Sequence, residues 1–529
     1  MNLKTYTKKE RNVFLSGLAG QNIIFNIMIV FTSFFLVHVL YIPALMVGVL
    51  LVITQVFDAV TDPFMGILVD RTKTRWGKCR PWLIFTPALI FLFVMLSFSG
   101  GVYQYGDDAS ALRNAGIVVW ITVAYLLWGI IYMAGDITLW GITSLMTENE
   151  EHRKNLQALA RLSALIGGGI GMLGFQPVAL ALSDAFGNLR MGFLVTALIF
   201  GLVAFVAYQL VGLFVKEKVA PPPMNTNAIS NFKMAWNNKP FRRVLLSGVL
   251  AAPRNIILIV AFPLITYYFA NFDPALVFLY TVIIGGGFMA GNALILPFVP
   301  KLLQRWRKKT LYNWSLLADV PCSLAAFALY LVVALTGVPD GMANIWALTC
   351  LAAILTVKGV CMGIFSVLQT NMITDAVDYE EYMNHRRPDG FFFSGQTFII
   401  KVGNGINNLL FLSLSAAVAF SGQSLQILQS FERMAEENYE YLAEQGIAVL
   451  RDVAQAGYHG VVLSLDGVGE LTGNRVFWFF AMMFFTISVV PAISAALAVI
   501  PTLKYELTEE KHEEILQELQ QRRRENETD

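Results

Sequence analysis

Two carboxylates one helical turn apart lie within an otherwise apolar stretch of the chain, residues 44–69. They are Asp58 and Asp62. At positions i and i+4 of a helix their side chains share one face, with Cβ atoms roughly 6 Å apart. Two carboxylates this close in a low-dielectric environment do not both stay ionised unless a proton or a cation lies between them. The pair therefore indicates a proton or cation site, and Na⁺ is the one metal ion it could hold.

Further charged residues interrupt other apolar stretches. A charge buried in a membrane is costly and tends to mark an ion or substrate pathway. Structural ion pairing, for example between Asp136 and Arg161, is the alternative for any single residue. For the whole set we favour function, because a merely structural bundle would avoid so many buried charges. The residues are Asp136, Arg161, Arg254, Asp319, Lys358, Asp375 and Lys401.

The composition shows what kind of scaffold must position these charges. Of 529 residues, 56% are hydrophobic and only 14% charged, whereas a soluble protein is roughly 45–50% apolar and about 25% charged. With 38 basic and 37 acidic residues, nothing favours a nucleic-acid partner. The four cysteines and five histidines are scattered, so neither disulfides nor a zinc site are indicated. The sequence predicts an all-α polytopic membrane protein whose surroundings are the lipid bilayer.

Apolar stretches long enough to cross a bilayer, about 20 residues each, occur twelve times. They fall near 13–40, 44–69, 82–101, 114–146, 156–182, 189–215, 242–269, 276–299, 311–336, 343–374, 391–420 and 475–500.

The basic residues between these spans predict an orientation. Segments on the N-terminal side of the membrane hold 29 of the 38 Lys and Arg, and the opposite loops hold five. Because positive charge accumulates in cytoplasmic loops, we expect both termini in the cytoplasm and the chain in the plasma (inner) membrane.

The spans divide into two halves. Residues 216–241, with four prolines and several charges, are predicted to form a cytoplasmic linker between six-span bundles at 1–215 and 242–502. Arg-Trp with basic neighbours follows span two (71–82) and span eight (301–314), which suggests an internal duplication typical of transporters.

Two polar segments stand apart from the spans. Residues 421–474 form an acidic insertion on the outer side, with helical periodicity over 424–445. It is either a lid over the outer mouth or a passive insertion. Residues 503–529 are expected to form a charged cytoplasmic tail helix.

Five motifs, in order along the chain, resemble one transporter family. They are FDAVTDPFMGILVDRTKTRWGKCRPW (57–82), YMAGDITLWGI (132–142), the region of Arg161, TDAVDYEEY (374–382) and FSGQTFIIKVGNGI (393–406). Together they resemble the glycoside–pentoside–hexuronide:cation symporters of the major facilitator superfamily. This resemblance implies a twelve-helix fold of two six-helix bundles and covers nearly the whole chain except 421–474.

The resemblance also implies roles for individual residues. Asp58 and Asp62 would carry the coupling cation, with Lys401 nearby. Gln396 and Thr397, one turn before Lys401, would belong to the substrate site. The sugar would contact three further residues, and a cytoplasmic salt-bridge network that breaks on opening would contain three more. The first set is Asp136, Trp140 and Arg161, and the second is Arg75, Asp375 and Asp378.

Departures from the family pattern affect the expected specificity. Gln21 and Asn22 stand where a characterised member has Lys-Asp, so a second sugar-binding carboxylate is replaced by Asn22. Two polar residues that help to hold sodium correspond here to Thr61 and Met133. A thioether is a poor ligand for a hard cation, so the sequence favours H⁺ over Na⁺ as coupling ion.

Arg254 suggests an acidic substrate such as a hexuronide. It lies twelve residues beyond Arg242, or about 18 Å along a helix, which reaches the middle of the membrane. An unpaired guanidinium there would bind a carboxylate in bidentate fashion. The alternative is that Arg254 pairs with Asp319 or with a backbone carbonyl.

The sequence thus predicts a cation-coupled symporter for a sugar or glycoside, without a cofactor and as a monomer. The alternatives are a polytopic membrane enzyme such as a lipid or glycosyl transferase, a transporter of a non-sugar organic anion, and a receptor or channel. HExxH and P-loop motifs are absent from the sequence, which disfavours an enzyme.

Overall fold

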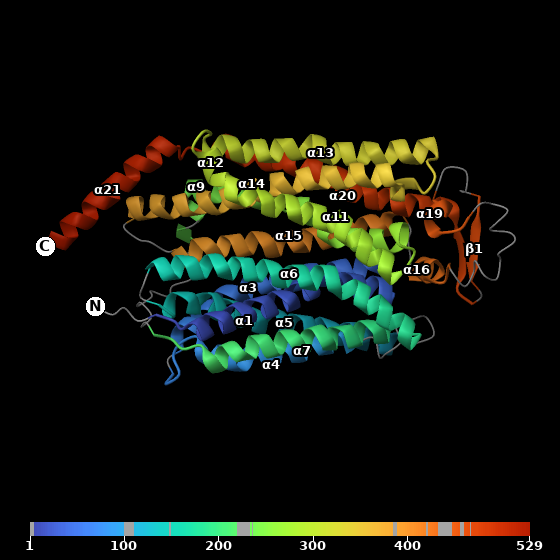
Figure 1. Ribbon diagram of the computed structural model, residues 1–529, viewed down its shortest axis with the longest axis horizontal. Helices are drawn as coiled ribbons and strands as arrows, with labels where there is room; N and C mark the ends of the chain where they lie inside the picture. Colours follow the sequence, from blue (N-terminus) through green and yellow to red (C-terminus); the bar gives the residue numbers. More distant parts are fainter. Residues whose placement is uncertain are drawn as a thin grey trace.

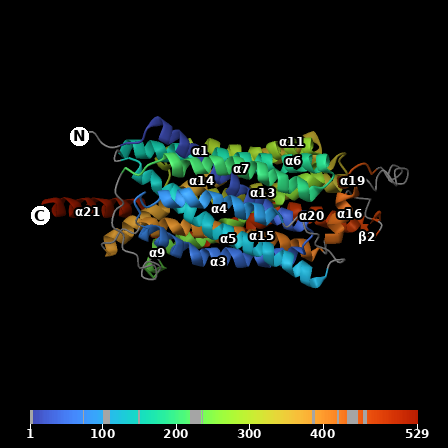
Figure 2. The same ribbon diagram turned by 90° about the horizontal axis from the view of Figure 1, so that it is seen from below.

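The computed structural model is a bundle of long helices that run side by side (Figure 1). It describes residues 5–72, 74–99, 110–147, 150–218, 233–234, 236–384, 389–418, 422–431, 447–454, 460–465 and 467–528. Both termini lie at one end of the bundle, called here the terminal end, and the acidic insertion lies at the opposite or far end (Figures 1 and 2).

Six long helices form the N-terminal half. They are α1 (Lys8–Asn26), which continues through η1 (Ile27–Phe31), α2 (Thr32–Phe34) and η2 (Phe35–Val39), then α3 (Ala44–Arg71), α4 (Arg80–Ser99), α5 (Ala111–Leu145), α6 (Glu150–Phe186) and α7 (Leu189–Phe214).

Six more form the C-terminal half. They are α9 (Lys239–Ala251), which continues through η4 (Ala252–Ile256), α10 (Ile257–Leu264) and η5 (Ile265–Phe269), then α11 (Pro274–Ile295) with η6 (Leu296–Phe298) and α12 (Val299–Leu303), α13 (Lys308–Thr336), α14 (Ile345–Asn384), α15 (Asp389–Ala417) and α20 (Gly473–Leu503). A short turn, η7 (Gly341–Ala343), joins α13 to α14.

All twelve expected spans are therefore helices, with ends within a few residues of the expected ones except at α14, which runs on to Asn384. Among the described residues, eleven helices are long and apolar enough to cross a membrane. The remaining one, α3, is 28 residues long, or about 42 Å. Within the described residues its apolar stretch is Met46–Gln55, and Asp58 and Asp62 lie further along the same helix. The protein is an all-α, multi-pass membrane protein.

The two halves meet along two pairs of helices. In sequence order α3 and α15 are the second and eleventh long helices, and α6 and α11 are the fifth and eighth; each pair packs across the interface. A two-fold exchange of the halves converts the second helix into the eighth and the fifth into the eleventh, so it relates one pair to the other. This is the arrangement expected of duplicated transporter halves.

Local backbone geometry repeats at matching positions in the two halves. The first helix of each half ends in a π-helical turn, at Phe35–Val39 and at Ile265–Phe269. A residue with positive φ follows in both cases, Tyr41 (60°) and Asn271 (44°). The turns begin at 35 and 265, and the Arg-Trp pairs begin at 75 and 305, so one offset of 230 residues relates both features. The geometry supports the duplication inferred from the Arg-Trp pairs.

Sequence signals explain where helices start and how closely they pack. Thr7 and Glu10 form a reciprocal capping box at the start of α1, which satisfies backbone N–H groups that have no helical partner. Gly167 of α6 lies against the backbone of Ala19, and Gly359 of α14 against that of Phe288. A methyl group at either glycine would collide with main-chain atoms, so these small residues allow close helix packing.

The insertion and the tail form separate small elements. The insertion contains α16 (Gly422–Gln429), α19 (Leu450–Val453) and a hairpin of β1 (Val462–Leu465) with β2 (Gly469–Thr472). Part of the helix expected over 424–445 is thus present in α16, while residues 432–446 lie outside the described residues. The expected tail helix is α21 (Glu509–Thr528), which projects from the terminal end (Figure 2).

Candidate functional site

The side chain of Asp58 is enclosed between α3, α5 and α15. It is 4% exposed, and its Oδ2 lies 4.0 Å from Nζ of Lys401 on α15. Gly129 of α5 faces it so closely that a Cβ there would lie 2.6 Å from Asp58 Oδ1. Thr61 donates its hydroxyl to the main-chain oxygen of Asp58 at 3.3 Å. The structure therefore joins the carboxylate and the lysine that the resemblance assigned to one cation site.

Asp62, predicted for the cation site, and Gln396 and Thr397, predicted for the substrate site, are placed only by their helices. Asp62 lies one turn beyond Asp58 in α3, and Gln396 and Thr397 lie one turn before Lys401 in α15. Their side chains lie outside the described part of the structure. The sharing of a proton or cation by two carboxylates therefore stays a prediction from their helical spacing.

Asp136 of α5 is held by α1. Gln21, which is 1% exposed, donates its Nε2 to Asp136 Oδ1 at 2.7 Å. Arg161, the pairing partner considered from sequence, is exposed on α6. Neighbouring Asn22 donates to the carbonyl of Leu18 in its own helix at 2.9 Å. The Gln21 amide therefore helps to orient this carboxylate.

One face of α5 carries both of these sites. Gly129, which contacts Asp58, and Asp136 are seven residues apart, about 10.5 Å along one side of the helix. Trp140, half-buried, follows one turn later. On the same helix the ring of Tyr132 stacks on Phe25 of α1, with centroids 5.2 Å apart. The contact with Asp58 and the Asp136 carboxylate thus lie along a single helix face.

The prediction of an unpaired Arg254 guanidinium in the central site is wrong. Its Nε donates to Asp319 Oδ2 of α13 at 3.0 Å, and Asp319 Oδ1 lies 3.9 Å from Nζ of Lys358 on α14. Lys358 also donates to Ser323, and Phe365 lies under the guanidinium at 4.9 Å. The three charged side chains are each 2% exposed. The alternative named from sequence, pairing with Asp319, is what the structure shows.

A second ionic cluster lies at the terminal end, but within one half. Lys308 bonds Asp375 at 2.6 Å. His512 of the tail helix lies 3.0 Å from Asp378 and 3.7 Å from Asp375. Arg75, expected in the same network, is exposed and lies over the ring of Trp76 at 5.4 Å. The two aspartates therefore share a cluster with the tail helix, and the structure does not bring Arg75 into it.

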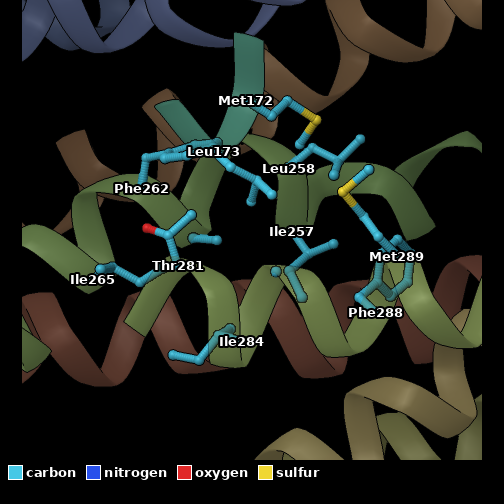
Figure 3. Close-up of a pocket in the computed structure, with 12 residues that line it drawn as sticks. Met172, Leu173, Ile257, Leu258, Phe262, Ile265, Thr281, Ile284, Phe288 and Met289 are labelled. Atoms are coloured by element: carbon cyan, nitrogen blue, oxygen red, sulfur yellow. The ribbon is translucent and has the colours of Figure 1, made fainter. Parts of the chain in front are cut away.

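At the far end the two halves are in direct contact. His38 Nδ1 lies 2.9 Å from the hydroxyl of Tyr267, and Gln176 of α6 donates to Thr266. The rings of Phe31 and Phe262 are tilted against each other with centroids 4.6 Å apart. Beside them, α6, α10 and α11 enclose a small cavity lined by apolar side chains and Thr281 (Figure 3). The far end is therefore closed by a largely apolar seam.

Sequence reasoning missed several residues that build these sites. Gln21 was noted only as a departure from the family pattern, and His38 and Tyr267 were not singled out. An amide or histidine inside an apolar span does need a buried hydrogen-bond partner, so these residue types were a usable signal. Gly129 gives no such signal, because only its distance from Asp58 reveals its role.

Comparison with known proteins places the chain among transporters. The model of the MFS/sugar transport protein family matches residues 13–434. The inner membrane symporter YicJ of Escherichia coli (strain K12) is 26% identical over 408 residues, 76% of this chain and 81% of that protein. The isoprimeverose transporter of Lactiplantibacillus pentosus is 27% identical over 425 residues, 78% and 81% of the two chains.

Solved structures agree on the fold. A bacterial homolog of the human lysosomal transporter Spinster, in an inward-facing and unoccupied conformation, superposes with a TM-score of 0.58 at 15% identity. The similarity covers 95% of this chain and all of that one. At this identity the comparison shows the architecture alone.

Proposed function

Because the chain belongs to the MFS/sugar transport protein family, we propose that it imports a sugar or glycoside together with a cation by alternating access. The observation that carries this proposal is the shared face of α5, where Gly129 meets the Asp58–Lys401 pair and Asp136 meets Gln21. A substrate on Asp136 and an ion at Asp58 would act on the same helix, which offers a route for coupling.

For the sugar, the roles follow from side-chain chemistry. The Asp136 carboxylate, held by Gln21, accepts hydrogen bonds from paired hydroxyls. The indole of Trp140 stacks on the sugar ring, and Arg161 donates to remaining oxygens. Asn22, one residue after Gln21, is the fourth side chain that we assign to sugar binding.

For the ion, we favour H⁺ over Na⁺. Lys401 already supplies a positive charge 4.0 Å from Asp58, so a metal cation there would meet repulsion, whereas a carboxylate can gain or lose a proton without a set of oxygen ligands. Met133, 8% exposed and one turn beyond Gly129, offers a thioether where a hard cation needs oxygen.

For the orientation, we propose that the terminal end faces the cytoplasm. The basic residues between the spans are concentrated there, as cytoplasmic loops require. The far-end contacts between His38 and Tyr267 and between Gln176 and Thr266 would then close the outer side.

For the charge of the substrate, we propose a neutral sugar or glycoside. The acidic alternative relied on an unpaired Arg254, and its pairing with Asp319 removes that support. Competition between glucuronides and the matching glucosides decides the point: stronger inhibition by the glucuronides would restore an acidic substrate.

Counterflow in proteoliposomes tests the substrate site. A panel of sugars and glycosides identifies a substrate for the parent, and Asp136→Asn is then compared with it. Asn keeps an oxygen for Gln21 but loses the charge that binds hydroxyls, and hydrogen bonds to charged groups contribute about 1.5–3 kcal/mol. We expect counterflow at least about tenfold weaker. The matched control is Asp184→Asn, an exposed position. Equal counterflow in D136N and D184N would refute the assignment.

Gradient-driven uptake tests the ion site. Asp58→Asn and Asp62→Asn should each abolish accumulation. Counterflow should persist in D58N, because the sugar site remains intact. The parent should respond to an imposed pH gradient rather than to a sodium gradient. Uptake that ignores external pH but rises with external Na⁺ would overturn H⁺ coupling, and accumulation by D62N at the parent's level would overturn the site itself.

A further inference from the structure

The acidic insertion packs against the far end of the bundle (Figures 1 and 2). Its helix α16 buries Leu425, Leu428 and the following Phe431, each no more than 3% exposed. The same helix begins so close to the main chain of Tyr41 that a side chain at Gly422 would approach the Tyr41 carbonyl oxygen to 2.9 Å. Helix α16 of the insertion is therefore packed against the seam between the halves.

One side chain of the insertion bonds both halves. Gln429, at the end of α16, donates its Nε2 to the main-chain oxygen of His38 and, at 3.3 Å, to the hydroxyl of Tyr267. Its Oε1 accepts from the hydroxyl of Tyr41. Burial raises the pKa of Tyr41 to about 12, so that hydroxyl keeps the proton it donates. His38 and Tyr41 belong to the N-terminal half and Tyr267 to the C-terminal half.

Leu450 and Arg451, in the α19 part of the insertion, bond the C-terminal half. Arg451 donates to the carbonyl of Phe269 at 3.3 Å and to Asp340 at 2.9 Å. The main-chain N–H of Leu450 donates to Asn271 at 3.3 Å. The chain also enters the insertion from α15 and leaves it into α20, both of that half. Separation of the halves at the far end would carry the insertion with the C-terminal half.

We propose that the insertion is a clasp: it is fixed to the C-terminal half, and Gln429 holds the N-terminal half so that the far end stays closed. Opening of that end must break the bonds from Gln429 to His38 and Tyr41, while the contacts of Arg451 can remain. The clasp thus shifts the resting population toward the closed far end. It goes beyond the proposed transport function, since it concerns the conformation without substrate.

Distances between spin labels on the two halves test the clasp directly. Ala185→Cys at the far end of α6 and Ile345→Cys at the start of α14 are both exposed positions. They are labelled in a background without the four native cysteines and measured by double electron–electron resonance in liposomes, with no substrate. Gln429→Ala should add or enlarge a longer-distance population. The matched control, Gln423→Ala on the exposed side of the same helix, should keep the parent's distribution.

A second variant guards against misfolding of the first. Tyr267→Phe removes only the hydroxyl that Gln429 and His38 contact and should shift the population in the same direction as Q429A. The proposal is overturned if both variants keep the parent's distribution, or if Q423A shifts it as much as Q429A. Because no substrate is present, failure of the clasp is separate from failure of the transport assignment, which D136N counterflow decides.

Discussion

A glycine opposite Asp58 sets the space available to that carboxylate. Since a Cβ at position 129 would lie 2.6 Å from Oδ1 and 2.9 Å from Oδ2, an added methyl group must displace the carboxylate rather than the main chain. Lys401 lies on a different helix, α15, so the Asp58 carboxylate would move relative to the ammonium group of Lys401. The cost of Gly129→Ala therefore falls on the position of the Asp58 carboxylate and not on the helix.

We expect Gly129→Ala to impair gradient-driven uptake while the protein remains folded. Overpacking costs about 1–3 kcal/mol, which is about 5- to 150-fold in an equilibrium constant; alanine itself favours a helix by about 1 kcal/mol over glycine. Uptake and thermal unfolding of the purified protein measure the two effects. Gly116→Ala on the same helix, with open space around it, is the control. Equal uptake by G129A and G116A would contradict this explanation.

At the scale of elements, three helices of the C-terminal half share one buried carboxylate between two cations. Arg254 lies in η4, Asp319 in α13 and Lys358 in α14. Pro253 is the second residue of η4, a 3₁₀ turn that separates α9 from α10 at the position where Arg254 bonds Asp319. Removing one partner of a buried ion pair leaves an uncompensated charge. Loss of the carboxylate would therefore destabilise the protein more than loss of either cation.

We expect Asp319→Asn to lower the stability of the protein by about 3–5 kcal/mol, because two buried cations lose their counter-charge. Lys358→Met should leave stability near or above the parent's, since Arg254 and Asp319 still pair one to one. Thermal unfolding in detergent, read by tryptophan fluorescence, compares the two variants. A decrease in stability in K358M as large as that in D319N would contradict this prediction, because Lys358 would then contribute more to stability than its charge.

At the scale of the whole molecule, the structure puts the termini at one end and the insertion at the other. We expect a membrane-impermeant maleimide to label Ser464→Cys in β1 on intact cells, and Glu514→Cys in α21 only after permeabilisation. Both positions are exposed, and a background without native cysteines excludes other labelling. The opposite pattern would reverse the orientation inferred from the basic residues.

The sequence by itself determined the spans, their division into halves and the helices that carry charge. This follows because the thickness of the bilayer fixes the length of an apolar helix and because a charge within such a stretch is visible without coordinates. The Arg-Trp pairs at 75 and 305 already indicated the duplication, which the matching π-helical turns at 35 and 265 support. The likeness in five motifs indicated the family, and the family model and the relatives confirm it.

Only the tertiary structure decided which polar groups face one another. Asp136 takes its hydrogen bond from Gln21, not from Arg161, and Arg254 pairs with Asp319 instead of remaining unpaired. Each pair joins residues on different helices, so it depends on how those helices are rotated and packed, which apolar periodicity does not specify when a helix is hydrophobic on all sides. The contacts of Gln429 with both halves could not be predicted from the sequence either, because they depend on how the two bundles pack together.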